Sequence, residues 1–285
     1  MRLASYVHNG AASYGIVTDK GIIDLKSRLT DYPTLKSFIE GNQFEGAEEM
    51  IGGPTDVALE EVTLIPTIPD AEKYICIGIN YANRETEYKD GSEKPKYPSV
   101  FMRTPDSFVG HGTPLTRPPE SEQLDYEGEI GVIIGKGGRR IPEAEAISHI
   151  AGLTVINEGS VRDWLRHAKF NVTQGKNFVH SGAMGPWMVT ADEIAGYTDL
   201  TVETRVNGEL RQQDTTANLM FPFAFLISYL SKFFLLKPGD VIATGTPNGA
   251  GARFDPPKYL KPGDKVEVTV PGVGVLANGI VDEEA

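Results

Sequence analysis

The amino-acid sequence predicts a mixed α+β fold dominated by strands, with a small N-terminal domain over residues 1–68 and a larger domain over residues 69–285. Three observations favour this architecture. Short β-branched runs bounded by Gly, Pro or Asn recur along most of the chain. After residue 73 only two segments are typical of helices, so the regular strand–helix alternation of a doubly wound sheet is missing. The stretch 65–69 holds two prolines, which stiffen the backbone and indicate a connector between domains.

The elements follow from these local patterns. In the N-terminal domain, strand-like runs cover residues 3–6, 15–17 and 21–25, and a helical stretch lies around residues 35–39. In the larger domain, strand-like runs cover residues 75–79, 130–134, 153–156, 201–206, 241–244 and 266–270, and helical runs cover residues 143–150 and 220–232. Asn207-Gly208 predicts a two-residue hairpin turn, because such turns need two positive φ angles. Lys-Pro-Gly-Asp at 237–240 and 261–264 indicates one tight turn used twice.

Composition narrows the class of protein. The 285 residues include 27 Lys+Arg against 39 Asp+Glu, and the formal charge of −12 argues against nucleic acid as a partner. With 40% hydrophobic and 23% charged residues, the chain resembles an ordinary globular protein. Cys76, the single cysteine, excludes an intrachain disulfide and fits a reducing compartment. No signal-peptide pattern opens the chain, and polar residues interrupt the apolar stretch 219–236, so we expect a cytoplasmic protein without membrane contact.

Familiar nucleotide-binding motifs are missing. Residues 135–138 do not fit the dinucleotide pattern Gly-x-Gly-x-x-Gly, and Gly175-Lys176 lacks both the upstream glycine and the following Ser or Thr of a phosphate-binding loop. The glycine-rich stretch 245–251 follows a strand without opening a clear helix. Nicotinamide and ATP chemistry are therefore disfavoured.

A pair of glutamates is the most informative local feature. Glu127 and Glu129 lead into the apolar run 131–134, and because side chains alternate along a strand they share one face, about 6.6 Å apart. A solvated edge strand is the simplest explanation of such a pair in general. Here the strand continues as an apolar run, and Gly128 leaves the opposite face without a side chain. Two carboxylates on a buried face predict a hard divalent cation between them.

A third acidic ligand is expected near the end of the next apolar strand. Glu158 lies between Asn157 and Gly159, just after the run 153–156. Asp163 is the competing candidate, although a position beside Arg162 also fits a simple ion pair.

Six motifs together resemble the fumarylacetoacetate hydrolase family, in order and spacing, over about residues 70–282. They are Cys76-Ile-Gly-Ile-Asn-Tyr81, Asp125-Tyr-Glu-Gly-Glu-Ile130, Gly175-Lys-Asn-Phe178, Gly185-Pro-Trp187, Lys237-Pro-Gly-Asp-Val-Ile-Ala-Thr-Gly-Thr-Pro-Asn-Gly249 and Leu276-Ala-Asn-Gly279. The resemblance implies a β-roll-like catalytic domain, a homodimer and one Mg²⁺ or Mn²⁺ per active site. It also implies a small anionic 2-oxo acid as the substrate.

The resemblance assigns the metal ligands by position. Glu127 and Glu129 match two of the family's ligands. Glu158 falls where the family usually has Asp, and the extra methylene keeps a carboxylate while moving it by more than an ångström.

A second departure concerns the group that activates water. Many family members carry a His three residues before a Glu in the segment after Asn-Tyr, whereas this chain has Arg84 followed by Glu87. A guanidinium stays protonated near neutral pH, so Arg84 cannot be an ordinary base and would instead bind a substrate carboxylate or orient Glu87. Glu87 then becomes the expected catalytic base, and a surface ion pair between the two residues is the alternative.

The remaining site residues also follow from the resemblance. Lys176 is the cation expected to stabilise an enolate, and Gln174 is expected to hydrogen-bond the reacting group. Thr246, with the backbone amides of Gly245 and Thr246, is expected to hold the substrate carboxylate. Tyr81 and Arg103 are further candidate substrate contacts, the latter for a distal carboxylate.

These residues predict a metal-dependent hydrolase that cleaves a C–C bond of a 2,4-dioxo acid, such as an acylpyruvate or fumarylpyruvate, through a metal-stabilised pyruvate enolate. The same enolate serves a decarboxylase, an isomerase or a hydratase acting on oxaloacetate or a 2-hydroxydienoic acid, so family resemblance does not choose among them. A non-catalytic binding protein of the same fold is the remaining alternative.

Overall fold

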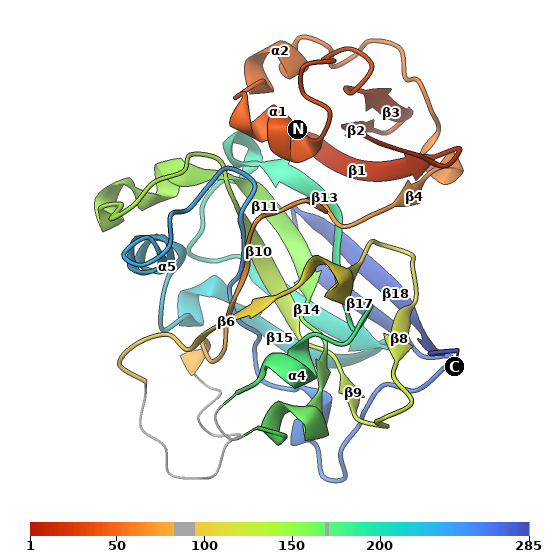
Figure 1. The fold of residues 1–285 in the computed structure, drawn as a ribbon, viewed down its shortest axis with the longest axis vertical. Helices are drawn as coiled ribbons and strands as arrows, with labels where there is room; N and C mark the ends of the chain where they lie inside the picture. The colour runs from red at the N-terminus through yellow and green to blue at the C-terminus, as the bar shows by residue number, and fades with distance from the viewer. Residues whose placement is uncertain (83–94, 169–170, 285) are drawn as a thin grey trace.

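The computed structural model describes residues 1–82, 95–168 and 171–284, and strands dominate this part of the chain (Figure 1). The mixed, strand-rich class predicted from sequence is confirmed. The described strands are β1 (Arg2–His8), β2 (Ala11–Thr18), β3 (Gly21–Asp24), β4 (Thr63–Leu64), β5 (Tyr74–Ile77), β6 (Val100–Arg103), β7 (Phe108–Val109), β8 (Leu115–Arg117), β9 (Leu124–Asp125), β10 (Gly128–Ile134), β11 (Ile150–Asn157), β12 (Ser160–Val161), β13 (Gly182–Thr190), β14 (Thr201–Val206), β15 (Glu209–Thr215), β16 (Val241–Ala243), β17 (Lys265–Val270) and β18 (Gly274–Asp282).

Helices in the described segments are short. The α-helices are α1 (Leu35–Glu40), α2 (Phe44–Glu48), α4 (Thr173–Lys176) and α5 (Phe223–Leu230), and the 3₁₀ turns are η1 (Leu59–Glu61), η3 (Pro105–Ser107), η4 (Glu143–His149), η5 (Arg162–Arg166), η6 (Ala191–Glu193), η7 (Thr216–Asn218) and η8 (Gly251–Arg253). None of the helices in these segments combines the length and hydrophobicity that crossing a membrane requires.

One large sheet carries the site strands. Its order is β3-β2-β1-β13-β11-β10-β16-β5-β6, with β4 beside β1 and β7 beside β13. The strands β10 and β11 are antiparallel, and their register pairs Gly128 with Asn157. This pairing places the start of β10 directly beside the end of β11, where two of the predicted carboxylates lie.

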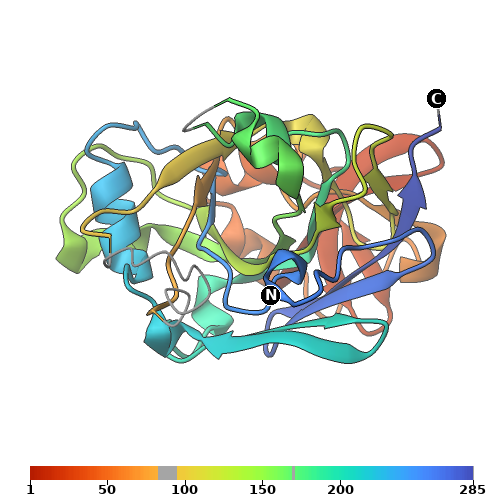
Figure 2. The same ribbon diagram turned by 90° about the horizontal axis from the view of Figure 1, so that it is seen from below.

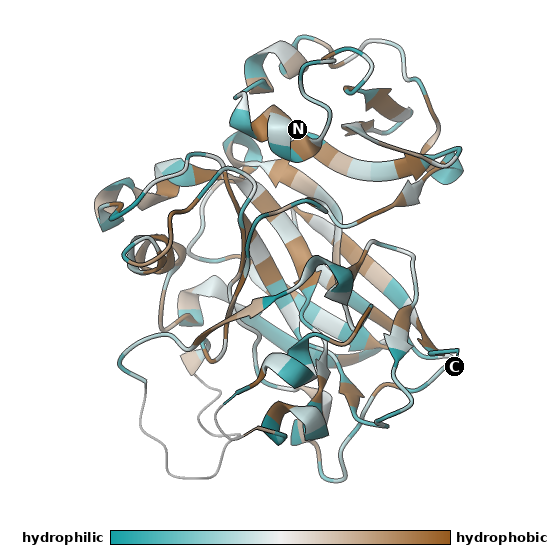
Figure 3. Cartoon of the chain, in the orientation of Figure 1, coloured by the Kyte–Doolittle hydropathy of each residue, from teal (hydrophilic) through white to brown (hydrophobic). Residues whose placement is uncertain are grey.

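A second sheet, of order β15-β14-β17-β18-β8, packs against the first, and Figure 2 shows it running beneath the molecule in that view. Hydrophobic side chains of both sheets and of α5 form one buried core, and Figure 3 shows the corresponding hydrophobic colouring on the strands and on α5. Gly128 lies at the contact between the sheets, because a Cβ atom built on it would be 2.1 Å from the hydroxyl of Thr204. The missing side chain therefore permits close packing on the face opposite the glutamates.

The predicted turns have the expected geometry. Asn207 and Gly208 take φ angles of 51° and 81° between β14 and β15, as a type I′ hairpin requires. In both Lys-Pro-Gly-Asp turns the Asp side chain accepts a hydrogen bond from the backbone N–H of the Lys, at 2.8 Å each time. The repeated sequence thus builds the same turn twice.

The predicted helix over residues 143–150 forms as a 3₁₀ helix, η4. Its buried side chains, Ala146 and His149, are three residues apart, which is one turn of a 3₁₀ helix. This buried side of η4 packs near α5.

The N-terminal residues extend the large sheet. β1 pairs with β13, with Leu3 opposite Met188, and buried residues of β1 to β3 share a core with Ile133 and Ile156. The boundary at residue 68 stays a prediction, and the structure adds that the segment before it is joined to the rest by backbone pairing and by a common core.

Candidate active site

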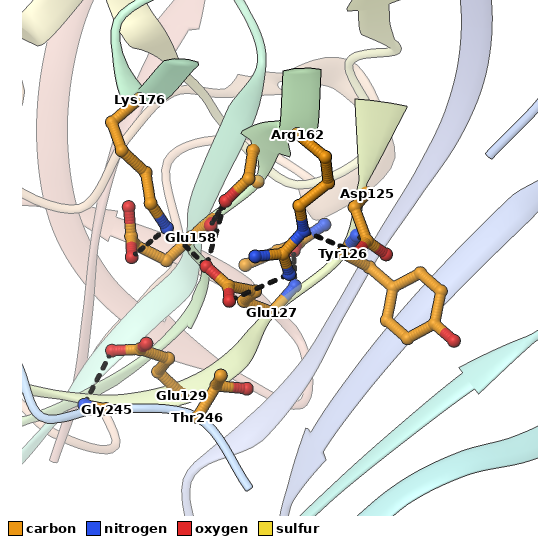
Figure 4. Close-up of polar contacts among 12 residues, drawn as sticks. Asp125, Tyr126, Glu127, Glu129, Glu158, Arg162, Lys176, Gly245 and Thr246 are labelled. Atoms are coloured by element: carbon orange, nitrogen blue, oxygen red, sulfur yellow. Dashed lines mark hydrogen bonds and ion pairs between the residues drawn. The ribbon is translucent and has the colours of Figure 1, made fainter. Parts of the chain in front are cut away.

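Three buried glutamates from two neighbouring strands converge on one space (Figure 4). Glu127 directly precedes β10, Glu129 lies within it, and Glu158 directly follows β11. The backbone N–H of Glu158 donates to the carbonyl of Glu127 at 2.7 Å, which extends the strand pairing to these two residues. Exposure of the three residues is between 1% and 3%, so a solvated edge strand does not describe them.

Lys176, from α4, brings a cation to this cluster. Its ammonium donates to Glu127 Oε2 and to Glu158 Oε2, the latter at 2.7 Å. Burial lowers the pKa of the Lys176 amine, but the charges of Glu127 and Glu158 outweigh burial and raise it above its ordinary value. The side chain is therefore a fixed cation beside two carboxylates.

Two arginines, Arg103, which is buried, and Arg162, which is mostly buried, hold the outer sides of the carboxylates. Arg103 Nη1 donates to Glu158 Oε1 at 3.1 Å, and Arg162 Nη2 donates to Glu127 Oε1 at 2.9 Å. Arg103 also donates to the carbonyl oxygens of Ser107 and Gly159 and to the hydroxyls of Ser107 and Ser181. All five N–H donors of Arg103 thus have acceptors in the protein, and the side chain supports Glu158. The expected contact of Arg103 with a distal substrate carboxylate stays a prediction.

Glu129 differs from its neighbours because no cation of the described residues pairs with it. Its Oε2 accepts a hydrogen bond from the backbone N–H of Gly245 at 2.8 Å. Burial raises the pKa of Glu129 well above its ordinary value, and the charges of Glu158 and Glu127 raise it further. A proton or a metal ion is what this environment favours at Glu129.

The donor set suits Mg²⁺ or Mn²⁺, although the side chains are not arranged around an ion. Within residues 1–82, 95–168 and 171–284, no three acidic, His or Cys side chains form a group close enough to hold a metal. The Lys176 ammonium lies between Glu127 and Glu158. Carboxylate oxygens are nevertheless the preferred ligands of these ions, and Glu129 is buried without an ion-pair partner among the described residues.

The loop after β16 is held by hydrogen bonds within the protein. Thr246 Oγ1 donates to the carbonyl of Gly128 at 2.8 Å and accepts from Gln212 Nε2 at 2.9 Å. The Gly245 amide points to Glu129, as described above. The two groups expected to bind a substrate carboxylate therefore bind protein atoms here, and that role stays a prediction.

Two predicted side chains carry buried polar atoms that no described residue satisfies. The hydroxyl of Tyr81 and Oε1 of Gln174 lack a hydrogen-bond partner in the described segments. Burial raises the pKa of the Tyr81 phenol, and the charge of Glu129 raises it further, so the group stays a hydrogen-bond donor. Their expected contacts with a substrate stay predictions.

The remaining predicted residues are Asp163, Arg84 and Glu87. Asp163 accepts a hydrogen bond from Ser121 at 2.6 Å, which favours Glu158 over it as the third carboxylate. Arg84 and Glu87 lie outside the described residues.

Sequence reasoning missed several supporting residues. Arg162, Ser160 and Gln212 hold Glu127 or the loop at Thr246 by hydrogen bonds, and Asp125 in turn binds Arg162. Of these four residues, only Asp125 could have been suspected from the sequence, because Asp125 stands two residues before Glu127 in the same motif.

The comparisons with known proteins agree with this geometry. Residues 73–281 match the family described as fumarylacetoacetate (FAA) hydrolase C-terminal. A curated relative, the oxaloacetate tautomerase YisK of Bacillus subtilis (strain 168), is 38% identical over 286 residues, which cover 93% of this chain and 94% of the relative.

Two solved structures share the fold. The fumarylacetoacetate hydrolase EaFAH of psychrophilic Exiguobacterium antarcticum has a TM-score of 0.81 at 31% identity, over 99% of this chain and all of the other. A maleylpyruvate hydrolase of Sphingobium sp. SYK-6, in complex with manganese(II) ion and pyruvate, has a TM-score of 0.81 at 24% identity over the whole of both chains. The family match, the full-length relative and the buried carboxylates at the predicted positions lead to one conclusion: this chain belongs to the fumarylacetoacetate hydrolase family.

Proposed function

We propose that this protein is a metal-dependent isomerase of small 2-oxo acids that interconverts the keto and enol forms of oxaloacetate. The observation that carries the proposal is the buried trio of Glu127, Glu129 and Glu158 beside the Lys176 ammonium, which suits the chemistry of an enolate. The tautomerase relative, similar over nearly the whole chain, supports oxaloacetate as the substrate.

We propose isomerisation in place of the C–C hydrolysis that the sequence alone favoured. Both reactions begin from a 2-oxo acid and pass through an enolate, so the site residues serve either. The relative from Bacillus subtilis, at 38% identity, is a tautomerase, whereas the hydrolase from Exiguobacterium antarcticum is 31% identical. Cleavage of a 2,4-dioxo acid is therefore the second candidate.

Glu127, Glu129 and Glu158 would hold one Mg²⁺ or Mn²⁺. When bound, such an ion supplies polarisation of the substrate's 2-oxo group, which makes the protons on the neighbouring carbon more acidic. The maleylpyruvate hydrolase with bound manganese shares only its fold with this chain. Support for a metal ion here comes from the three carboxylates of this chain.

The chain's own residues account for removal of the C3 proton and for stabilisation of the enolate, and solvent supplies the proton on the C2 oxygen. Conversion of the keto form to the enol removes a proton from C3, forms the C2–C3 double bond and places a proton on the C2 oxygen. Two of the three N–H groups of Lys176 donate to carboxylates of the described residues, which leaves the third to stabilise the negative oxygen. Glu87, assigned from the sequence, is the proposed base that takes the C3 proton.

A direct assay tests the proposal. Enol oxaloacetate absorbs in the ultraviolet more strongly than the keto form, so the decay of this absorbance measures tautomerisation. We expect Mn²⁺ or Mg²⁺ to accelerate the decay in the presence of the protein, and a chelator to remove the effect. If acetylpyruvate is cleaved rapidly while enol oxaloacetate decays at its uncatalysed rate, the hydrolase alternative replaces the proposal.

A further inference from the structure

We propose that Arg162, fixed by Asp125, is a positioning residue that sets the orientation of Glu127 for metal binding. This inference rests on the metal site proposed above and adds to it a buried ion pair in contact with one of its carboxylates. Arg162 belongs to η5, and Asp125 ends β9, so two separate segments of the chain combine behind Glu127 (Figure 4).

The Asp125 carboxylate accepts four hydrogen bonds from the protein. Its Oδ1 accepts from the backbone N–H groups of Gly251 and Tyr126, at 2.7 Å and 2.9 Å. Its Oδ2 accepts from the N–H of Ala252 at 2.9 Å and from Arg162 Nε at 2.7 Å. Four donors on a fully buried carboxylate leave it little freedom to act as a metal ligand itself, and they fix the place of the guanidinium.

Arg162 joins Asp125 to the site. Its Nε binds Asp125, and its Nη2 binds Glu127 Oε1 at 2.9 Å. The planar guanidinium holds these two donors in a fixed relation, which a lysine ammonium does not reproduce. Only about a tenth of the Arg162 side chain is exposed, so solvent screens these contacts weakly.

The opposite oxygen of Glu127 is held as well. Glu127 Oε2 accepts from Lys176 and from the hydroxyl of Ser160, the latter at 2.9 Å. Glu127 is thus oriented from two sides before any ion binds, whereas Glu129 has one backbone donor. Preorganised ligands lose less conformational freedom on binding, so removal of the Arg162 contact should weaken metal binding.

Electrostatic attraction alone predicts that loss of Arg162 strengthens metal binding. Removing a positive charge near the carboxylates strengthens their attraction for a divalent cation. The sign of the change in metal affinity therefore separates positioning from simple electrostatics, and neither depends on turnover.

The experiment measures Mn²⁺ binding by electron paramagnetic resonance of the free ion, with R162Q, R162K and wild type. R117Q is the matched control, because Arg117 pairs with Asp282 on the surface. We expect the dissociation constant of R162Q to rise at least about tenfold, as is usual when a partner of a metal ligand is removed. R162K should lie between R162Q and wild type, and R117Q should match wild type.

The outcomes separate the two proposals. Wild type that binds Mn²⁺ with R162Q equal or tighter overturns the positioning role and leaves the metal site standing. R162K as tight as wild type shows that charge suffices and also overturns it. Wild type that binds no Mn²⁺ overturns the metal site and this inference together. Circular dichroism of the metal-free proteins checks folding, and R162K alone decides the question if R162Q does not fold.

Discussion

At the scale of single residues, Gly128 links the site to the core. One side of its strand position faces the glutamates, and the other packs on β14 and β17. A Cβ atom there would lie 2.1 Å from Thr204 Oγ1 and 3.0 Å from Val268 Cγ1. The G128A variant should therefore lose about 1–3 kcal/mol of stability through overpacking, measured by urea unfolding.

Gly46 provides the control for this substitution. It lies in α2, and an added Cβ would have no atom within 4 Å. G46A should leave the free energy of unfolding unchanged or raise it by up to about 1 kcal/mol, because Ala favours helix more than Gly. A loss in G46A as large as that in G128A would contradict the packing explanation.

Glu87 carries the prediction about proton removal. If it is the base, E87Q should lose turnover of enol oxaloacetate while its affinity for Mn²⁺ stays that of wild type, because glutamine cannot accept the C3 proton. Steady-state rates and metal titration on the same sample measure both. Unimpaired turnover would refute the assignment.

Residue chemistry also shows how far sequence reasoning reaches. Glu127 and Glu129 could be proposed as a pair because alternation along a strand places them on one face, and Glu158 could be proposed because it follows an apolar run. Arg162 and Gln212 were not, because their contacts depend on how distant segments meet. The engagement of Arg103 by five protein acceptors likewise depends on tertiary structure that no local pattern contains.

At the scale of elements, an ion pair ties β3 to the loop before η1. Asp56 accepts from the backbone N–H of Asp24 at 2.7 Å and from Arg28 Nη2 at 3.0 Å. The hydrogen bond from Arg28 lowers the pKa of Asp56 below its ordinary value of 3.8. A carboxylate with a depressed pKa contributes stability that is present above the unfolded value and is lost as the pH falls through the folded one.

The D56N variant tests this contribution. It should be less stable than wild type at neutral pH, and the difference should shrink as the pH falls below about 4. Urea unfolding at successive pH values measures the two curves. A difference that stays constant down to acid pH would show that the charge of Asp56 is not the cause.

The sequence predicted which segments form strands better than it predicted which strands pair. The strand over residues 201–206 and its hairpin turn appear as predicted, because a two-residue turn fixes register locally. The pairing of β1 with β13 joins residues far apart in the chain, and no local signal encodes it.

At the scale of the whole molecule, hydrophobic cores packed on the sheets support one charged site. The sheets bury the carboxylates, and Arg103, Arg162 and Lys176 keep Glu158 and Glu127 in place. The separate N-terminal domain expected from the proline-rich connector stays a prediction, and the structure adds that buried residues of this segment share a core with the rest of the chain. Such shared burial could not be predicted from the sequence, because it depends on which faces of distant segments meet.

Glu129 gives the most direct test of the proposed metal site, because it is buried and has no ion-pair partner among the described residues. The most direct test is the rate of enol oxaloacetate decay as a function of Mn²⁺ concentration, for wild type, E129Q and the exposed control E145Q. We expect a metal-dependent acceleration in wild type and E145Q that is lost in E129Q. Equal acceleration by E129Q, or full activity of wild type in chelator, would contradict it.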